Sequence, residues 1–331
     1  MTRQFDLSMG TVWRIFFIIA VIGILYVLRS VIALFCIAFV ISSACGPAVL
    51  WMHNRRVPRP LAVGVIYIVF ASILGLLFSF VVPSVAEQVS SFSRTISGDA
   101  SAVSPIVGVS PQEIRQIVQS FGEALSSSFG DILSKTVGVF QGLVGLMAVV
   151  SMSFYLSLDP DGLRRFLISI TPKRYQDYVV SLATRIQQQI GKWMLGQLFV
   201  MVLVGVLYYI VLSLLGVPYA LVLAIIGGLV EIIPYIGPVV AGVPAVLLAF
   251  FMVSPWTSVI VLVSYILIQQ VENHVIIPQI MRRAVGLNPL VVILSLLVGA
   301  QLGGVLGILL AVPVATALNV FLRDVFDKKM P

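Results

Sequence analysis

The sequence is poor in charged residues, and this scarcity excludes most water-soluble proteins. Charged side chains make up 10% of the 331 residues and hydrophobic side chains 60%, whereas a soluble globular domain has about 25% charged residues. A chain with so few charges could not cover a folded core of this size with polar surface. The composition therefore predicts a membrane protein.

The sequence also lacks the motifs of common enzymes. It contains no phosphate-binding loop, dinucleotide fingerprint, nucleophile elbow or metal triad, so we predict no enzyme activity, no cofactor and no metal. Cys36 and Cys45 lie in one apolar run without metal-ligand spacing and are interpreted as small buried residues. The net charge of +7 comes from short basic clusters between apolar runs, which indicates membrane topology and argues against a nucleic-acid partner.

Long apolar runs are abundant. The runs include 11–29, 61–82, 195–215 and 259–268. Most of them are near the roughly 20 residues that a helix needs to cross a bilayer. The first run continues past Arg29 to Trp51, too far for a cleaved signal peptide, so it is interpreted as two retained helices. Because the runs are continuous and do not alternate with polar residues, a membrane β-barrel is excluded. We predict an all-α, polytopic protein of the lipid bilayer with about eight hydrophobic segments.

The basic residues predict the orientation in the membrane. The loop 53–59 and the segment 159–185 are rich in Arg and Lys, which the positive-inside rule places in the cytoplasm. The segment 84–135 has few basic residues and is expected outside, where Ser110–Glu113 forms a capping box that begins a helix. We predict a multi-pass protein of the bacterial inner membrane with both termini in the cytoplasm.

The C-terminal part contains two blocks with a similar layout. Each has a span followed by two apolar arms that meet at a Gly- or Pro-containing break, and the expected hairpins cover 218–255 and 289–322. Because the spans run in opposite directions, the blocks are expected to form an inverted repeat, which is typical of secondary transporters. The predicted division is three spans (1–83), an external helical segment (84–135), a fourth span with an interfacial helix (136–194) and a transport core (195–331).

Two polar groups in apolar surroundings are the candidate substrate or ion site. A charged carboxylate at membrane depth, such as Glu231, costs several kcal/mol unless it has a partner, a water-filled cavity or a proton. At the end of the last full span, Gln269, Glu272 and Asn273 share a helix face, and His274 could relay protons. The alternatives are a structural partner for Glu231 and an ordinary helix cap for the second group. Hairpin breaks, whose free backbone groups can bind ligands, add Pro234, Tyr235, Gly237, Pro238, Gln301, Gly303 and Gly304.

The C-terminal half resembles the autoinducer-2 exporter family, also called the PerM-like permeases. The similarity rests on the segments 231–238, 272–281, 285–289 and 303–313. The resemblance implies an inner-membrane homo-oligomer, such as a pentamer, in which the hairpins move like an elevator. It adds Pro278 to the candidate residues, and it supports Glu231, Pro234, Gly237, Pro238, Glu272 and Asn273.

Three functions agree with the sequence. The first, which we favour, is gradient-driven export of a small polar metabolite or signal such as autoinducer-2, with Glu231 and Glu272 as coupling or substrate groups. The second is Na⁺(Li⁺)/H⁺ antiport by the same two carboxylates. The third is a membrane scaffold or channel that does not transport actively and works through its external segment.

Overall fold

The structure, a computed structural model, describes three stretches of the chain: 13–84 (without 14, 15, 18, 21, 22, 25, 78, 81 and 82), 136–281 and 287–327. Nearly all of the expected external segment, including the capping box at 110–113, lies outside the described residues. The elements found within these stretches are all helices, and five of them are long and apolar enough to cross a membrane. The predicted all-α, polytopic fold is confirmed.

Long helices alternate with short ones along the chain. The long ones are α2 (Arg29–Asn54), a helix at Arg59–Leu77, α5 (Thr136–Leu158), α7 (Gln176–Leu214), α10 (Pro255–Val271) and α12 (Pro289–Phe326). The short ones are α6 (Pro160–Ile170), η1 (Lys173–Tyr175), α8 (Ala220–Val230), α9 (Gly237–Met252), η2 (Glu272–Ile276) and α11 (Ile277–Met281).

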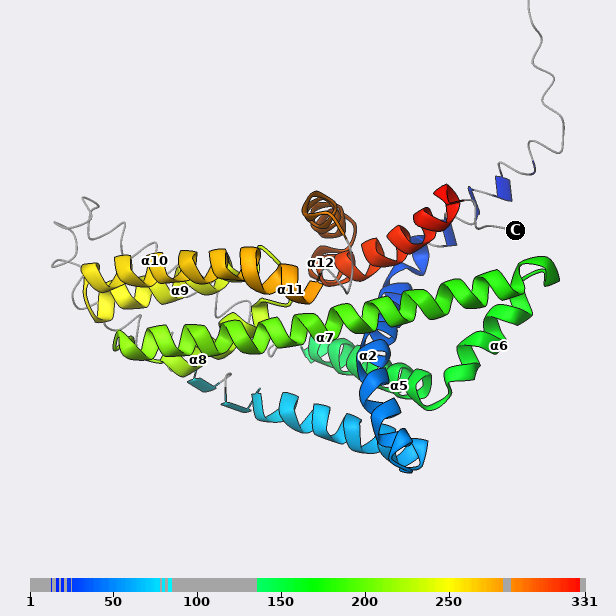
Figure 1. The fold of residues 1–331 in the computed structure, drawn as a ribbon, viewed down its shortest axis with the longest axis horizontal. Helices are drawn as coiled ribbons and strands as arrows, with labels where there is room; N and C mark the ends of the chain where they lie inside the picture. The colour runs from blue at the N-terminus through cyan, green and yellow to red at the C-terminus, as the bar shows by residue number, and fades with distance from the viewer. Residues whose placement is uncertain are drawn as a thin grey trace, which may run out of the picture.

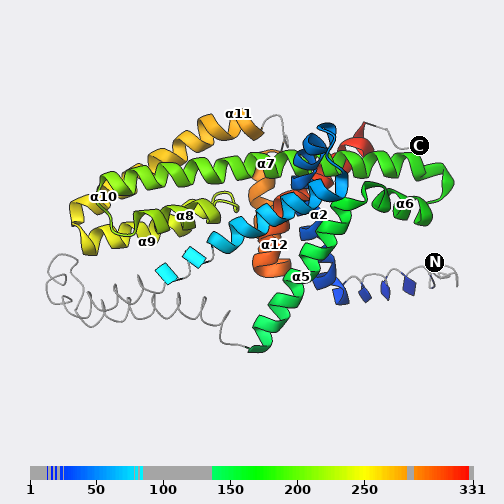
Figure 2. The same cartoon turned by 90° about the horizontal axis from the view of Figure 1, so that it is seen from below.

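Helix α7 is the axis of the molecule. Its 39 residues extend for about 58 Å, with α8, α9 and α10 along one half and α6 beside the other (Figures 1 and 2). The boundary expected between an interfacial helix and the transport core, at residues 194 and 195, lies inside this helix. No proline interrupts α7, so its backbone hydrogen bonds continue through the expected boundary.

Helices α8 and α9 form a hairpin that packs against α7 and α10 (Figure 1). Small residues allow α7 and α8 to approach closely: a Cβ atom on Gly228 would lie 2.7 Å from the carbonyl oxygen of Met201. Apolar side chains from α7, α8, α9 and α10, including Val204, Ala241 and Val261, form one buried core. This core fixes the hairpin beside the second half of α7.

Helix α12 is itself a hairpin. At Gly304 the backbone has a φ of 57° and a ψ of −135°, a conformation that favours glycine because other residues meet a steric penalty there. The two arms lie in backbone contact at Gly299 and Gly307, where a side chain on either residue would overlap the other arm. The arms occupy the region that the sequence analysis assigns to the second hairpin.

Polar contacts join α2, the helix Arg59–Leu77 and α5. The buried Ser157 hydroxyl donates to Ser42 Oγ over 3.0 Å and lies 3.1 Å from the Tyr67 hydroxyl. The carbonyl oxygen of Ser157 accepts a hydrogen bond of 3.1 Å from Arg59 Nε. Because each group has a partner, these polar residues are tolerated between apolar helices.

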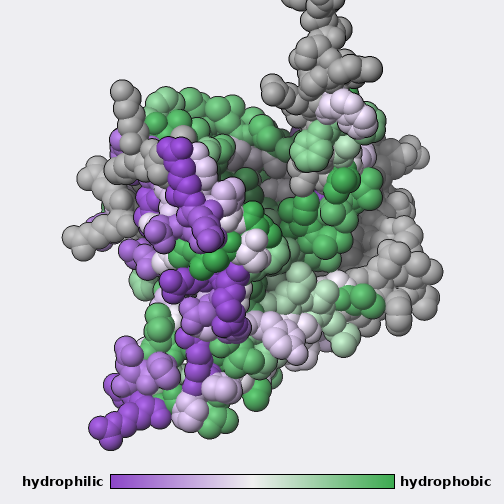
Figure 3. Space-filling model, turned by 90° about the vertical axis from the view of Figure 1, so that its right-hand side faces the viewer, coloured by the Kyte–Doolittle hydropathy of each residue, from purple (hydrophilic) through white to green (hydrophobic). Residues whose placement is uncertain are grey.

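Hydrophilic residues gather at one end of the molecule, where α6 meets the start of α7 and where α12 ends (Figure 3). Exposed basic residues of this end include Arg164, Arg165, Lys173 and Arg174. At the turn itself, the Gln176 side chain donates hydrogen bonds of 3.0 Å to the carbonyl oxygens of Ile168 and Thr171, which secures the end of α6. These bonds fix the turn between the two basic segments.

Candidate functional site

A cavity of about 800 Å³ lies where the α8–α9 turn, η2 and both arms of α12 meet the middle of α7. Among the predicted site residues, Pro234 and Tyr235 reach it from the turn, Glu272 and Asn273 from η2, and Pro278 from α11. The rest of the wall comes from α7, from α11, from the start of α12 with the two residues before it, and from the second arm of α12, through Trp193, Gln197, Val200, Ile277, Leu287, Asn288, Pro289, Val292 and Val312. The structure thus brings together the breaks that follow α8 and α10.

The turn between α8 and α9 is shaped by three residues. Pro234 has no amide hydrogen, so it cannot continue the helical bonding of α8, and Tyr235 adopts a left-handed φ of 68°. Gly237 then passes close under the turn, since a Cβ atom there would lie 2.8 Å from the Cα of Glu231. These constraints hold the turn against the end of α8.

A glutamine of α7 stabilises this turn. Gln197 Nε2 donates a hydrogen bond of 2.6 Å to the carbonyl oxygen of Glu231. The Gln197 side chain is 3% exposed, so the bond satisfies a backbone group that water does not reach. It connects the cavity wall directly to the residue that ends α8.

Glu231 and Glu272 are buried beside each other. Glu231 is 0% exposed and Glu272 2% exposed, and their side chains interact electrostatically. Within the described structure neither carboxylate oxygen of Glu231 has a hydrogen-bond partner of acceptable geometry, whereas Glu272 Oε2 accepts a long bond of 3.4 Å from Gln269 Nε2. Gln269 Oε1 is buried and also lacks a partner among these residues. Oxygen atoms in this arrangement can hold a proton or a small cation.

The second break is a π-helical turn. In η2 the amide of Ile277 donates to the carbonyl oxygen of Glu272, five residues earlier, a geometry that is rare and often found at functional sites. The wide turn buries Glu272 and places Asn273 in the cavity wall. His274 is exposed and its Nδ1 lies 3.0 Å from the Gln270 carbonyl oxygen, so it lies outside the cavity.

Some predicted residues lie elsewhere. Gly237 and Pro238 begin α9 behind the turn, and neither contributes to the cavity wall. Gly303 and Gly304 line a second, mostly apolar cavity of about 920 Å³ between α2 and the arms of α12. Gln301 is exposed at the α12 bend and lines neither cavity. The breaks of the two hairpins therefore do not meet at one site.

Several residues of the cavity wall were not predicted from the sequence. Trp193 and Gln197 lie on a continuous helix, where no break draws attention to them. The signal for Gln197 was available, because it is an amide inside the apolar run 195–215. Tyr208 and Tyr265, which stack behind the site with ring centroids 4.1 Å apart, were also missed. Their side chains are buried, and their hydroxyl groups lack hydrogen-bond partners in the described part of the chain.

Comparison with known proteins identifies the family. Residues 15–327 match the profile of the AI-2E family transporter. The chain is 25% identical to the putative transport protein YrrI of Bacillus subtilis over 89% of this chain and 87% of that protein. It is 22% identical to the AI-2 transport protein TqsA of Escherichia coli over 89% of this chain and 86% of that protein. The chain belongs to the AI-2E family of membrane transporters.

Proposed function

We propose that the protein exports a small, uncharged polar metabolite through the cavity and that a proton or cation gradient drives the export. The observation that supports this most directly is the position of Glu231. Its carboxyl group is fully buried, has no hydrogen-bond partner among the described residues, and interacts with Glu272, which lines the cavity. A group that must be neutral or balanced by a cation in one state is suited to coupling transport to an ion gradient.

The cavity wall indicates the class of substrate. Its volume of about 800 Å³ is within the range of about 300–1,000 Å³ that is typical of small-molecule sites. The wall combines the rings of Trp193 and Tyr235 with the amides of Gln197, Asn273 and Asn288. None of its described residues is a lysine or an arginine, which favours an uncharged substrate over an anionic one. The name of TqsA makes AI-2 the first molecule to test.

The orientation follows from the basic end of the molecule. The exposed residues Arg164, Arg165, Lys173 and Arg174 belong to α6 and η1, directly before α7, and the positive-inside rule favours the cytoplasm for such a surface. We therefore assign this end to the cytoplasmic side of a bacterial inner membrane. Export would then carry the substrate from this end past the middle of α7.

The test is transport by the full-length protein in liposomes under an imposed pH gradient. AI-2 and a panel of neutral polar metabolites are loaded on one side, and wild type is compared with Glu231→Gln and with Asp161→Asn, an exposed carboxylate on α6. We expect metabolite flux in wild type and in Asp161→Asn, and loss of gradient-driven flux in Glu231→Gln. Equal gradient-driven flux in all three proteins would refute a coupling role for Glu231.

One observation favours a second function, Na⁺(Li⁺)/H⁺ antiport. Glu231, Glu272 and the unpaired Gln269 Oε1 supply oxygen atoms near one another, and oxygen ligands suit hard cations. In the same liposomes without metabolite, antiport predicts proton movement that depends on Na⁺ or Li⁺ and is lost in Glu231→Gln. Metabolite flux without such proton movement would reject this alternative.

A further inference from the structure

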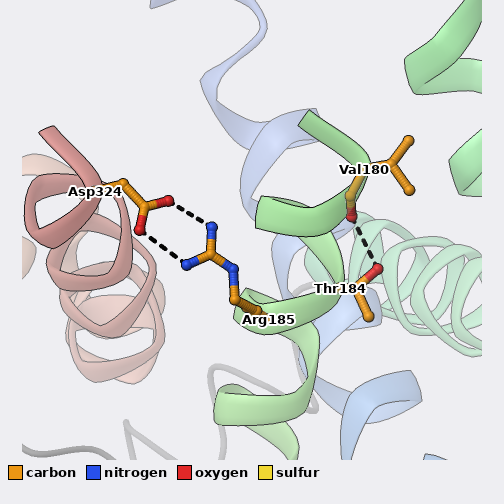
Figure 4. A network of polar contacts seen from close by, with 4 residues as sticks. All are labelled: Val180, Thr184, Arg185 and Asp324. Atoms are coloured by element: carbon orange, nitrogen blue, oxygen red, sulfur yellow. Dashed lines mark hydrogen bonds and ion pairs between the residues drawn. The ribbon is translucent and has the colours of Figure 1, made fainter. Parts of the chain in front are cut away.

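A partly buried ion pair joins α7 to the end of α12. Arg185 donates two hydrogen bonds to Asp324, from Nη1 to Oδ1 over 2.8 Å and from Nη2 to Oδ2 over 2.5 Å (Figure 4). The Asp324 side chain is 2% exposed and that of Arg185 40% exposed, and Tyr178 interacts electrostatically with both. A paired geometry of this kind is among the stronger polar contacts in proteins. The pair lies at the polar end of the molecule and connects residues 139 positions apart in the chain.

The same two helix faces lead from the ion pair to the cavity. On α7, Arg185, Gln189, Trp193 and Gln197 recur every four residues and share one side of the helix. On the second arm of α12, Thr316 and Asn319 lie between Val312 and Asp324. Trp193 and Val312 pack together and both line the cavity. The ion pair and the cavity are therefore the two ends of one seam.

This seam carries polar groups although it runs between apolar helices. The Thr316 hydroxyl is fully buried and bonds to the Val312 carbonyl oxygen over 2.8 Å. Asn319 Nδ2 is buried and has no hydrogen-bond partner within the described residues. An apolar seam would close more stably, because a buried amide without a partner costs free energy. Polar groups here suit the passage of a hydrated or polar molecule.

We propose that the Arg185–Asp324 pair is the gate that closes the seam between the cavity and the polar end of the molecule. The inference rests on the proposed transport function and identifies the side on which the cavity is closed in this structure. When the pair separates, the second arm of α12 can move away from α7, and Trp193 and Val312 part. Arg185 and Asp324 are thus positioning residues, because they act on the cavity through the helices that carry them.

The experiment measures access to the cavity without requiring transport. Cys36 and Cys45 are replaced by alanine, and Val292→Cys introduces a reporter in the cavity wall. The full-length protein in lipid nanodiscs, with both faces open to solvent, is treated with a small charged thiol reagent. The gate variants are Arg185→Gln, Asp324→Asn and the charge reversal Arg185→Asp/Asp324→Arg. The matched control is Arg165→Gln, which removes an exposed ion pair with Asp159.

We expect the two single variants to label the reporter about tenfold faster, a change that corresponds to about 1.4 kcal/mol. The charge reversal should return labelling towards the wild-type rate, and Arg165→Gln should leave it unchanged.

If a single variant lowers the unfolding temperature without changing the labelling rate, the pair only stabilises the fold and the gate is refuted. If Asp324→Asn does not fold, Arg185→Lys serves instead, because it keeps the charge and loses the two-point contact. The labelling assay does not require transport, so a failed coupling site, seen as equal gradient-driven flux in Glu231→Gln, and a failed gate, seen as unchanged labelling in Arg185→Gln, are different results.

Discussion

The hydrogen bond from Gln197 to the Glu231 carbonyl oxygen gives a prediction with a calculable size. Gln197→Leu keeps a side chain of similar volume but removes the donor, and it leaves a backbone oxygen without this partner in a place that water does not reach. An unsatisfied buried carbonyl costs about 1–3 kcal/mol, which raises the population of the open turn by about five- to 150-fold. We expect amide hydrogen exchange at residues 231–237 to accelerate by a factor in this range.

The assay is hydrogen–deuterium exchange on the purified protein, followed by transport in liposomes. Gln188→Leu is the control, because Gln188 is exposed on the same helix. Gln197→Leu should accelerate exchange in the turn and leave the first half of α7 as in wild type, and it should reduce transport because Glu231 is no longer held. Unchanged exchange in the turn would show that the bond does not position Glu231 and would refute the reasoning.

Three further predictions concern helix contacts and breaks. Gly228→Val should lower the free energy of unfolding by about 1–3 kcal/mol, and with it the unfolding temperature, because its Cβ would lie 2.7 Å from the Met201 carbonyl oxygen. The control is Gly75→Val, which should be tolerated because nothing lies within 4 Å of a Cβ atom at that position. Gly304→Ala should lower the free energy of unfolding by about 1–2 kcal/mol, because a φ of 57° is strained for alanine. The same thermal unfolding experiment measures this change. Deleting Val275, which is exposed in η2, should convert the π-helical turn to an α-helix and abolish transport. Val275→Ala keeps the chain length and should transport normally; transport by the deletion variant would contradict a role for the wide turn.

Much of the fold could be predicted because its determinants are local. Apolar runs of bilayer length predict long helices, and Gly or Pro breaks predict hairpins, as seen for α8–α9 and for α12 at Gly304. The length of α7 was not predicted. The polar first half of this helix resembles a separate surface helix in composition, and only its packing against α6 and α12 reveals one continuous element.

The residues of the candidate site that could be predicted from the sequence are those with unusual chemistry for an apolar run. Glu231 and Glu272 are conspicuous because carboxylates are rare in apolar runs, and the structure brings them together. Gln301 and Gly304 have similar local signals, yet the packing of α12 against α2 keeps their break away from the cavity. No local pattern distinguishes the two breaks, because their positions depend on contacts between segments far apart in the sequence.

One face of α7 connects every functional feature of the molecule. Arg185 binds the end of α12, Trp193 and Gln197 line the cavity, and Tyr208 stacks on α10 behind the carboxylates. No proline interrupts α7, and sharp kinks almost always occur at a proline or another break in the helical hydrogen bonds, so these four contacts keep their spacing along α7. In the transport cycle that we propose, movement therefore occurs in the elements that pack against this face, and the breaks before α9 and in α12 are where those elements can bend. A kink engineered into α7 should consequently uncouple the gate from the cavity, whereas the same kink in an outer helix should not.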